Sequence, residues 1–320
     1  MTPIANDLSH LPRAGQGLQP DVLIRFADVL VNAWQAGMDD DKPNAIAGTR
    51  FRHSNAGKCA RMLGYVAAGI PKSDPMDLSG VMNVSVGTML HDAWQAALLE
   101  RYPDAEIEPK VATVGADGSG HIDAVVRDGG HVVAIELKTI GGFGFKNAIG
   151  RARKGQQAEG PRTDHILQAA LNGLAVDADE VVVVYLAKEA LSKNMRVDDE
   201  RDRFLAEWTF SREQYEPLAV AEADRVAKIL AIVDGGELPK RVLPHDMPPG
   251  AEIVAPSSGR WEVHSADGEV TDTGSVWLCN YCSHQTLCAQ TEPGRIPISE
   301  VPVWTADPFD GLPDFGDETP

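Results

Sequence analysis

The sequence predicts an α/β fold, and three observations support this prediction. Apolar residues recur at helical spacing in several long segments, shorter segments show the alternation or continuous apolar character of strands, and the two kinds of segment are interleaved along the chain. With 320 residues, of which 43% are hydrophobic, the chain is long enough to bury one elaborated domain or two modest ones.

The first third of the sequence predicts two amphipathic helices. Apolar spacing of three and four residues predicts a helix over residues 20–37, which ends at a glycine, and a second over residues 82–99. We expect the first helix to have only a packing role. The second carries His91 within its apolar pattern.

From Ile107 onward the apolar pattern changes to that of strands. Strands are expected over residues 107–114, 121–127 and 131–137. The turn sequence Asp128-Gly129-Gly130 joins the last two, so they are expected to form a hairpin or part of a meander.

Helix and strand patterns alternate in the second half. A stretch rich in glycine and polar residues, 141–161, precedes a helix over 164–174 capped by Thr163 or Asp164. A buried strand is expected over 180–187. The remaining expected segments are a helix over 212–233, a connector containing Pro239, Pro244, Pro248 and Pro249, and a short strand over 261–263.

The charge balance limits the classes of partner. The formal net charge of -18 argues against a protein that coats nucleic acid over its whole surface, so any DNA-binding surface must be local. One basic island satisfies that condition, although a solvated mobile loop explains it equally well. Its members are Lys146, Arg151, Arg153, Lys154 and Arg162.

Two carboxylates and a lysine occupy neighbouring predicted strands. Asp123 opens one strand, while Glu136 and Lys138 close the next and share a face because side chains alternate along a strand. Such carboxylates suit Mg or Mn, which would polarise a phosphodiester and lower the pKa of a bound water, and the ammonium would orient that water or offset transition-state charge. The alternative is the solvent face of an edge strand.

The four cysteines suggest one metal centre. Cys279, Cys282 and Cys288 lie within ten residues, and Cys59 is distant in sequence. Four thiolates suit either a structural zinc or an iron-sulfur cluster, and buried free cysteines are a third reading. A zinc-dependent deaminase fits poorly, because no H-x-E motif accompanies the cysteine pair.

The order of these motifs resembles that of the PD-(D/E)XK nucleases, specifically the RecB-like branch. The matching motifs are Gly87-x-x-x-His91, Gly120-x-x-Asp123, Glu136-x-Lys138 and Gln168. The resemblance implies a restriction-endonuclease-like core, with a mixed central sheet flanked by helices.

The resemblance also implies a role for each motif residue. Asp123 and Glu136 would be the principal Mg or Mn ligands, His91 an additional ligand from a helix, Lys138 the catalytic lysine, and Gln168 a residue that orients the lysine or the water. The chain departs from the pattern at Asn172, where relatives commonly have tyrosine.

The cysteine arrangement resembles the iron-sulfur clasp of RecB-like exonucleases of the CRISPR-adaptation group and of AddB-type subunits. This resemblance implies a 4Fe-4S cluster rather than zinc, held in a cysteine-clasped subdomain that ties the two ends of the chain together. The implied ligands are Cys59, Cys279, Cys282 and Cys288.

Together these features predict four regions. They are an N-terminal helical region (1–80) that contributes Cys59, a nuclease core (81–235), a C-terminal segment with the cysteine triplet (236–290), and an acidic, proline-containing tail (291–320), extended or disordered. The tail is expected to be solubilising, with docking on a protein partner as the alternative.

The expected function is metal-dependent DNA exonuclease activity in recombination, repair or end processing. The alternative is a non-catalytic nucleic-acid-binding or assembly subunit on a nuclease scaffold. DNA is the expected partner, as single strands or duplex ends. The sequence shows neither a signal peptide nor a membrane span, so we expect a cytoplasmic protein of a bacterium or a phage-infected host, without membrane contact.

Overall fold

The computed structural model describes residues 50–151, 155, 157–193, 199–242, 251–254, 262–268, 270–272, 278–279 and 281–302. The helix predicted over 20–37 lies outside these residues. So do Arg153 and Lys154 of the basic island and the acidic tail beyond residue 302.

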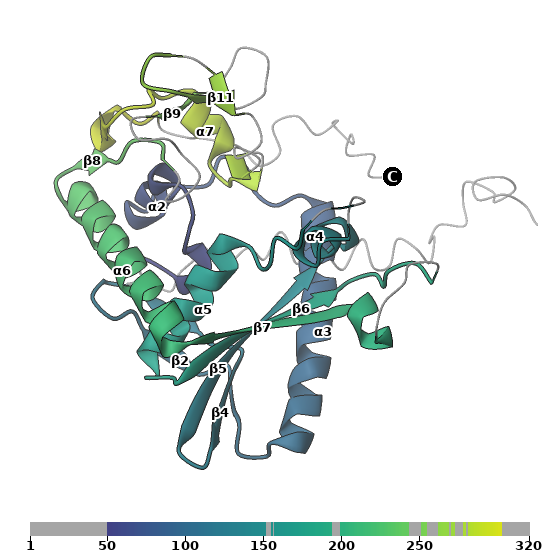
Figure 1. The fold of residues 1–320 in the computed structure, drawn as a ribbon. Coiled ribbons are helices and arrows are strands. Elements are labelled where there is room, and N and C mark those ends of the chain that lie inside the picture. The colour runs from purple at the N-terminus through teal and green to yellow at the C-terminus, as the bar shows by residue number, and fades with distance from the viewer. Residues whose placement is uncertain are drawn as a thin grey trace, which may run out of the picture.

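A five-stranded mixed sheet forms the centre of the fold (Figure 1), which confirms the predicted α/β class with a mixed central sheet. The strand order is β1-β4-β5-β6-β7, with β5 and β6 parallel and the other neighbours antiparallel. The bounds are β1 Glu106–Ile107, β4 Ala124–Asp128, β5 His131–Ile140, β6 Glu180–Ala187 and β7 Leu205–Ser211.

The predicted hairpin is present as β4 and β5, which pair antiparallel from Ala124 opposite Ile135 to Asp128 opposite His131. Gly129 and Gly130 both have positive φ in the turn between them, a conformation that glycine adopts without steric cost. Because β5 also pairs with β6, it is an interior strand. The edge-strand interpretation of Glu136 and Lys138 is therefore wrong.

The strand predicted over 107–114 is broken at Glu108, which has a φ of 53° and precedes Pro109. Proline offers no N–H for a ladder, and the left-handed residue before it turns the chain. The segments on either side join different sheets, since β1 pairs with β4 while β2 (Lys110–Ala112) pairs with β3 (Ser119–His121). Asp123 thus lies between β3 and β4 and does not open a strand.

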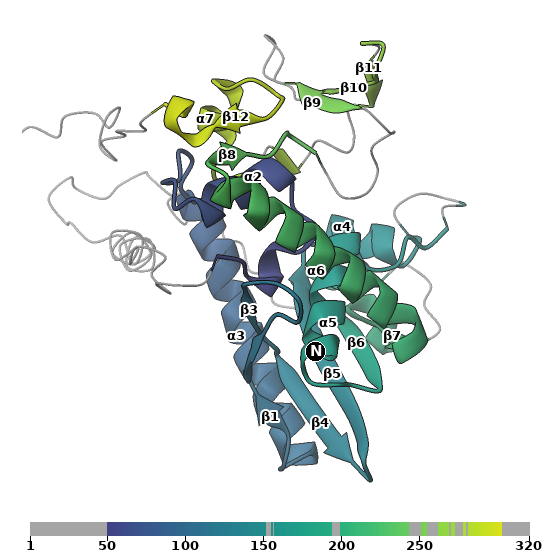
Figure 2. The ribbon, with the colours of Figure 1, turned by 90° about the vertical axis from the view of Figure 1, so that its left-hand side faces the viewer.

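Helices lie on both sides of the sheet. Figure 2 shows α3 (Leu78–Arg101) on one side of β4 and β5, and α5 (Thr163–Ala175) with α6 (Arg212–Asp234) on the other. The predicted helices over 82–99, 164–174 and 212–233 are confirmed. Within the described residues, however, Val84 and Met89 of α3 are exposed, so its apolar pattern does not mark a buried face there.

Several short elements were not predicted. The glycine-rich stretch begins with a helix, α4 (Gly142–Ala148), because Phe145 and Ala148 are buried in the core. Helix α2 (Ala60–Ala67) and strand β7 also escaped prediction. At α5 the N-cap residue is Arg162, and no side chain caps the helix, contrary to the expected Thr163 or Asp164 cap.

Beyond the end of α6 lie β8, β9 and α7 (Figure 1), and a second cluster of buried side chains includes Tyr65, Leu238, Ile253 and Leu287. Residues 291–302 belong to this cluster, because Ile296–Pro297 pairs with Glu237–Leu238. The prediction of an unstructured tail from Thr291 is therefore wrong for these residues.

The remaining elements are β8 Glu237–Leu238, β9 Glu252–Val254, β10 Glu262–His264, β11 Val270–Asp272, α7 Gln285–Ala289, β12 Ile296–Pro297 and the 3₁₀ helices η1 His53–Asn55, η2 Glu200–Arg203 and η4 Ile298–Glu300. Among the described helices, none combines the length and hydrophobicity that a membrane crossing needs.

Candidate active site and cysteine site

Helix α3 carries His91 toward Asp123, the carboxylate at the break between β3 and β4. His91 Nδ1 lies 3.7 Å from Asp123 Oδ1. The other carboxylate oxygen, Oδ2, accepts a hydrogen bond of 2.6 Å from the backbone N–H of Leu137 on the neighbouring strand. This contact fixes the Asp123 side chain against the strand that carries Glu136 and Lys138.

Glu108 joins these two residues, although the sequence did not suggest it. Ligand atoms of His91, Glu108 and Asp123 all lie within 4.8 Å of one another, close enough to hold one metal ion. Gln95, one turn beyond His91 on α3, donates to Glu108 Oε1 at 3.0 Å and so orients it. The one local feature that could have drawn attention to Glu108 is its position directly before a proline in a strand-like segment.

Glu136 and Lys138 form an ion pair on β5 in which the carboxylate is buried and the lysine is partly exposed. Glu136 is 1% exposed, and its Oε1 lies 2.5 Å from Lys138 Nζ. Its Oε2 accepts a 2.8 Å hydrogen bond from the Asn172 side-chain amide. Glu136 is not one of the three residues grouped within 4.8 Å; in this structure its Oε1 forms the ion pair with Lys138 and its Oε2 accepts the hydrogen bond from Asn172.

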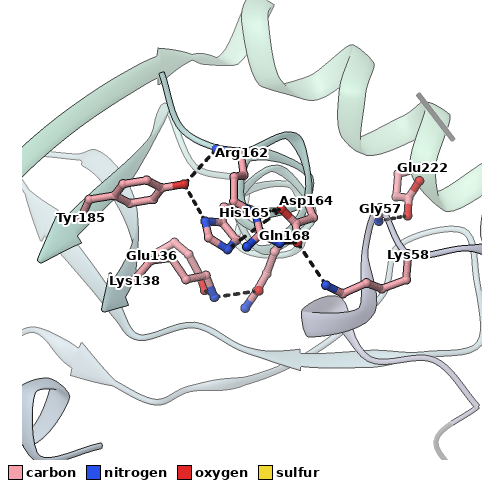
Figure 3. A network of polar contacts seen from close by, with 10 residues as sticks. All are labelled: Gly57, Lys58, Glu136, Lys138, Arg162, Asp164, His165, Gln168, Tyr185 and Glu222. Atoms are coloured by element: carbon pink, nitrogen blue, oxygen red, sulfur yellow. Dashed lines mark hydrogen bonds and ion pairs between the residues drawn. The ribbon is translucent and has the colours of Figure 1, made fainter. Parts of the chain in front are cut away.

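Helix α5 contacts Lys138 and Glu136 of β5 through two residues that lie one turn apart. Gln168 Oε1 accepts a 2.9 Å hydrogen bond from Lys138 Nζ (Figure 3). Asn172, which stands where the family pattern has tyrosine, bridges Glu136 and His53, and its Oδ1 lies 2.7 Å from His53 Nδ1. The departure from the pattern thus places a different hydrogen-bonding residue beside the carboxylate.

The glycines of two motifs are explained by close contacts. A Cβ at Gly87 would come within 2.9 Å of Thr139 Oγ1, where α3 packs against β5. A Cβ at Gly120 would come within 2.3 Å of His53 Nδ1 and 2.9 Å of Asn172 Oδ1. Both positions require glycine because a side chain would separate the elements that carry the site residues.

Burial raises the pKa of the Asp123 and Glu136 carboxyls. The pKa of Asp123 rises to about 6, with Lys138 and the Leu137 N–H acting in the opposite direction. The pKa of Glu136 rises to about 7, because burial and the nearby Asp123 charge outweigh Lys138 and Asn172. Burial lowers the pKa of His91, with Lys138 adding to the effect, which favours the neutral imidazole that binds metals.

A polar network around the start of α5 reaches Lys58 (Figure 3). Asp164, in the first turn of α5, accepts from Lys58 Nζ at 3.1 Å and from Arg162 Nε at 3.0 Å. The Tyr185 hydroxyl accepts from the Arg162 N–H at 2.8 Å and contacts His165 Nδ1 at 2.6 Å. Lys58 directly precedes the first cysteine, so the network connects α5 with the start of the cysteine region.

The described members of the predicted basic island do not all line the same cavity. Arg162 lines the cavity that also contains the cysteines, whereas Lys146 on α4 and Arg151 line neither this cavity nor the one at His91. Lys58 and Lys188 lie in the cysteine cavity with Arg162. The basic residues of this cavity therefore come from separate parts of the sequence.

All four cysteines, Cys59, Cys279, Cys282 and Cys288, line one cavity of about 610 Å³. Among the described residues no three of their sulfur atoms lie within 4.8 Å of one another, whereas four thiolates around one zinc ion would be about 3.8 Å apart. Burial raises the pKa of the Cys282 thiol to about 12 and that of Cys288 in the same direction.

Two buried arginines flank the cysteines. Arg61 donates to the carbonyl oxygens of Pro239 and Glu292, and no carboxylate among the described residues pairs with it. Arg241 donates to the carbonyl oxygen of Cys288. Both guanidinium groups lower the pKa of the Cys288 thiol, against the larger effect of burial.

No family model and no curated protein sequence matches the chain. Among solved structures it is similar to SSO0001, with 16% identity, a TM-score of 0.45, and coverage of 84% of this chain and 99% of that one. It is also similar to an alkaline exonuclease (LHK-Exo) from Laribacter hongkongensis, with 14% identity, a TM-score of 0.39, and coverage of 64% and 93%. The same exonuclease in complex with dAMP aligns at 14% identity and a TM-score of 0.34, over 47% of this chain and 67% of that one.

Proposed function

We propose that this chain is a metal-dependent DNA nuclease of the PD-(D/E)XK type, acting as an exonuclease in recombination, repair or end processing. The observation that carries the proposal is the convergence of Asp123, Glu136 and Lys138 at the centre of the sheet, with His91 and Glu108 facing Asp123. Burying charged groups costs folding free energy, and ionisable groups with strongly shifted pKa values cluster at functional sites.

The donor set fits a hard divalent cation. His91, Glu108 and Asp123 offer one nitrogen and two carboxylate groups within reach of one ion. Burial raises the pKa values of Asp123 and Glu136, which disfavours their ionised forms. A bound cation would favour the ionised forms and so offset this effect. Mg or Mn bound here would polarise the scissile phosphate and lower the pKa of an attacking water.

The other residues position groups around that centre. Glu136 and Gln168 hold the Lys138 ammonium in place, and Lys138 would orient the water or offset the negative charge that develops on the phosphate. Asn172 fixes the Glu136 carboxylate by its hydrogen bond to Oε2. A shift of Glu136 toward the cation would complete the ligand set that the sequence motifs imply.

We further propose that the four cysteines hold a 4Fe-4S cluster with a structural role. Among the described residues no three of their sulfur atoms lie within 4.8 Å of one another, and in a cluster each thiolate binds a different iron, so its sulfur ligands lie farther apart than around one zinc ion. The buried guanidinium of Arg61 fits an anionic cluster better than four neutral thiols. The cluster would join Cys59 to residues 279–288 and close a very long loop.

The test is cleavage of end-labelled DNA with Mg or Mn after anaerobic purification. Lys138→Ala is expected to reduce cleavage about 100-fold or more. The matched control is Lys228→Ala, an exposed lysine of α6, which is expected to cleave like the wild type. Equal cleavage by Lys138→Ala and wild type would reject the assigned site. DNA binding by the wild type without cleavage would favour the non-catalytic assembly subunit.

A further inference from the structure

A chain of hydrogen bonds between buried side chains ends on Glu136. Asn172 Nδ2 donates to Glu136 Oε2 at 2.8 Å, and Asn172 Oδ1 lies 2.7 Å from Nδ1 of His53 in η1. The other ring nitrogen of His53, Nε2, lies 2.8 Å from Thr113 Oγ1. His53, Asn172 and Thr113 are all buried, so each of these polar groups depends on the next one for a partner.

The Glu136 carboxylate sets the direction of the first bond. The oxygens of a carboxylate paired with Lys138 only accept, so Asn172 must turn its N–H groups toward Glu136 and its Oδ1 toward His53. The amide nitrogen also donates to the His121 carbonyl oxygen at 3.4 Å, which requires the same orientation. One orientation of the Asn172 amide therefore satisfies all of these neighbours.

That orientation assigns the proton of the His53 ring. An amide oxygen only accepts, so His53 must donate to Asn172 from Nδ1. Burial lowers the pKa of His53, against the effect of the Asn172 hydrogen bond, and so favours the neutral ring. A neutral ring with its proton on Nδ1 accepts at Nε2, so the Thr113 hydroxyl donates. The bonds thus run in one direction, from Thr113 to Glu136.

Two glycines let the backbone pack directly on these bonds. A Cβ at Gly120 of β3 would come within 2.3 Å of His53 Nδ1 and 2.9 Å of Asn172 Oδ1. A Cβ at Gly118 would come within 2.6 Å of Thr113 Oγ1. The backbone at these two positions therefore leaves His53 and Thr113 little room to change partners.

Asparagine at position 172 makes the histidine necessary. A side-chain amide has a donating and an accepting end, and a half-turn of the group exchanges them. Without a donor at its Oδ1, the Asn172 amide is free to turn over and to place its oxygen against Glu136 Oε2, where two acceptors repel each other. The Nδ1–H of His53 removes that alternative.

We propose that His53, held by Thr113, is a positioning residue that fixes the Asn172 amide and, through it, the Glu136 carboxylate. Its action is indirect, because the path from His53 to Glu136 runs through Asn172. The effect on cleavage rests on the proposed nuclease function, whereas the direction of the hydrogen bonds does not.

The first test is the tautomer of His53, read from long-range proton–nitrogen NMR correlations of histidine-labelled protein at pH 8 in EDTA. The His53 signals are those missing from His53→Gln or His53→Asn. We expect the proton on Nδ1 and none on Nε2. A proton on Nε2 alone would overturn the proposal, because Nδ1 would then accept from Asn172 and the amide oxygen would face Glu136.

The second test compares Thr113→Val, which removes the hydroxyl with little change in shape, with Thr113→Ser, which keeps it. In single-turnover cleavage with Mn, the valine variant is expected to be slower by about tenfold and to need more Mn for half its maximal rate. The serine variant is expected to restore both. A role confined to folding would not change the Mn dependence of the folded molecules. The matched control is His131→Gln, at the exposed start of β5, which is expected to match the wild type.

Equal rates and equal Mn dependence in Thr113→Val and Thr113→Ser would overturn the positioning role. A wild type that cleaves DNA while His53 carries its proton on Nε2 would remove this proposal and leave the nuclease function. A wild type that never cleaves, with the His53 proton on Nδ1, would remove the nuclease function and leave the orientation of Glu136 by His53 and Asn172.

Discussion

Replacing Asp123 by asparagine is expected to stabilise the metal-free protein while abolishing cleavage. Burial raises the pKa of Asp123 from 3.8 to about 6, so above pH 6 the folded state holds an ionised carboxylate that would be better solvated in the unfolded chain. At about 1.4 kcal/mol for each pKa unit, the cost is about 3 kcal/mol. Asparagine keeps the oxygen that accepts from the Leu137 N–H and removes the charge.

The direction in which this stability difference changes with pH follows from proton linkage. A carboxyl whose folded pKa is raised binds its proton more tightly in the folded state, so the stability it contributes is present at low pH and is lost as pH rises from about 4 to above 6. About half of the cost is present at pH 5 and nearly all of it at pH 8. The advantage of the Asp123→Asn variant over wild type must therefore grow with pH.

Thermal melting in EDTA measures this difference. For a chain of 320 residues, about 3 kcal/mol corresponds to about 4 °C, so the variant should melt about 4 °C above wild type at pH 8 and about 2 °C above it at pH 5. Added Mg should raise the melting temperature of the wild type but not that of the variant. If the variant melts at or below the wild-type temperature at both pH values, the reasoning about Asp123 is refuted.

Three further changes have expected outcomes. Glu108→Gln should weaken Mg or Mn binding measured by calorimetry, whereas Glu106→Gln, two residues away and paired with Arg127, should not; equal affinities would remove Glu108 from the site. Asn172→Ala should lower the melting temperature by about 2 to 4 °C and slow cleavage, because Glu136 and His53 each lose a buried partner; unchanged melting would contradict that role. Cys282→Ser should reduce bound iron and thermal stability, and a wild-type protein that contains zinc and no iron would reject the cluster.

The parts of the fold with strong local patterns were predictable from sequence. Helices α3 and α6, strand β6 and the β4–β5 hairpin appear close to their predicted positions because apolar periodicity and a Gly-Gly turn are local signals. Strand β7 was missed, since it is a half-buried edge strand without a continuous apolar run. Its pairing with β6 depends on contacts between distant segments.

The site was predictable only as far as its residues lie in motifs. His91, Asp123, Glu136, Lys138 and Gln168 were singled out, and the structure gathers them around β5 and α5. The role of Glu108 depends on a left-handed residue at a strand break, which no periodicity reveals.

The hydrogen-bonding partners of Asn172 could not be predicted from the sequence either. The sequence shows only that it replaces a tyrosine of the pattern, whereas in the structure Gln168 accepts from Lys138 and Asn172 donates to Glu136. The sequence revealed a difference from the family pattern, but the hydrogen-bonding partners required three-dimensional contacts between α5, β5 and η1.

The most direct test of the nuclease assignment is single-turnover cleavage of end-labelled single-stranded DNA at pH 8 across a series of Mn concentrations, with wild type and Glu136→Gln compared. We predict cleavage by the wild type that requires the cation and stops in EDTA, and a rate for Glu136→Gln that is lower by about 100-fold or more. Cleavage that persists in EDTA, or that proceeds equally in the two proteins, would contradict the assignment of hydrolysis to these residues.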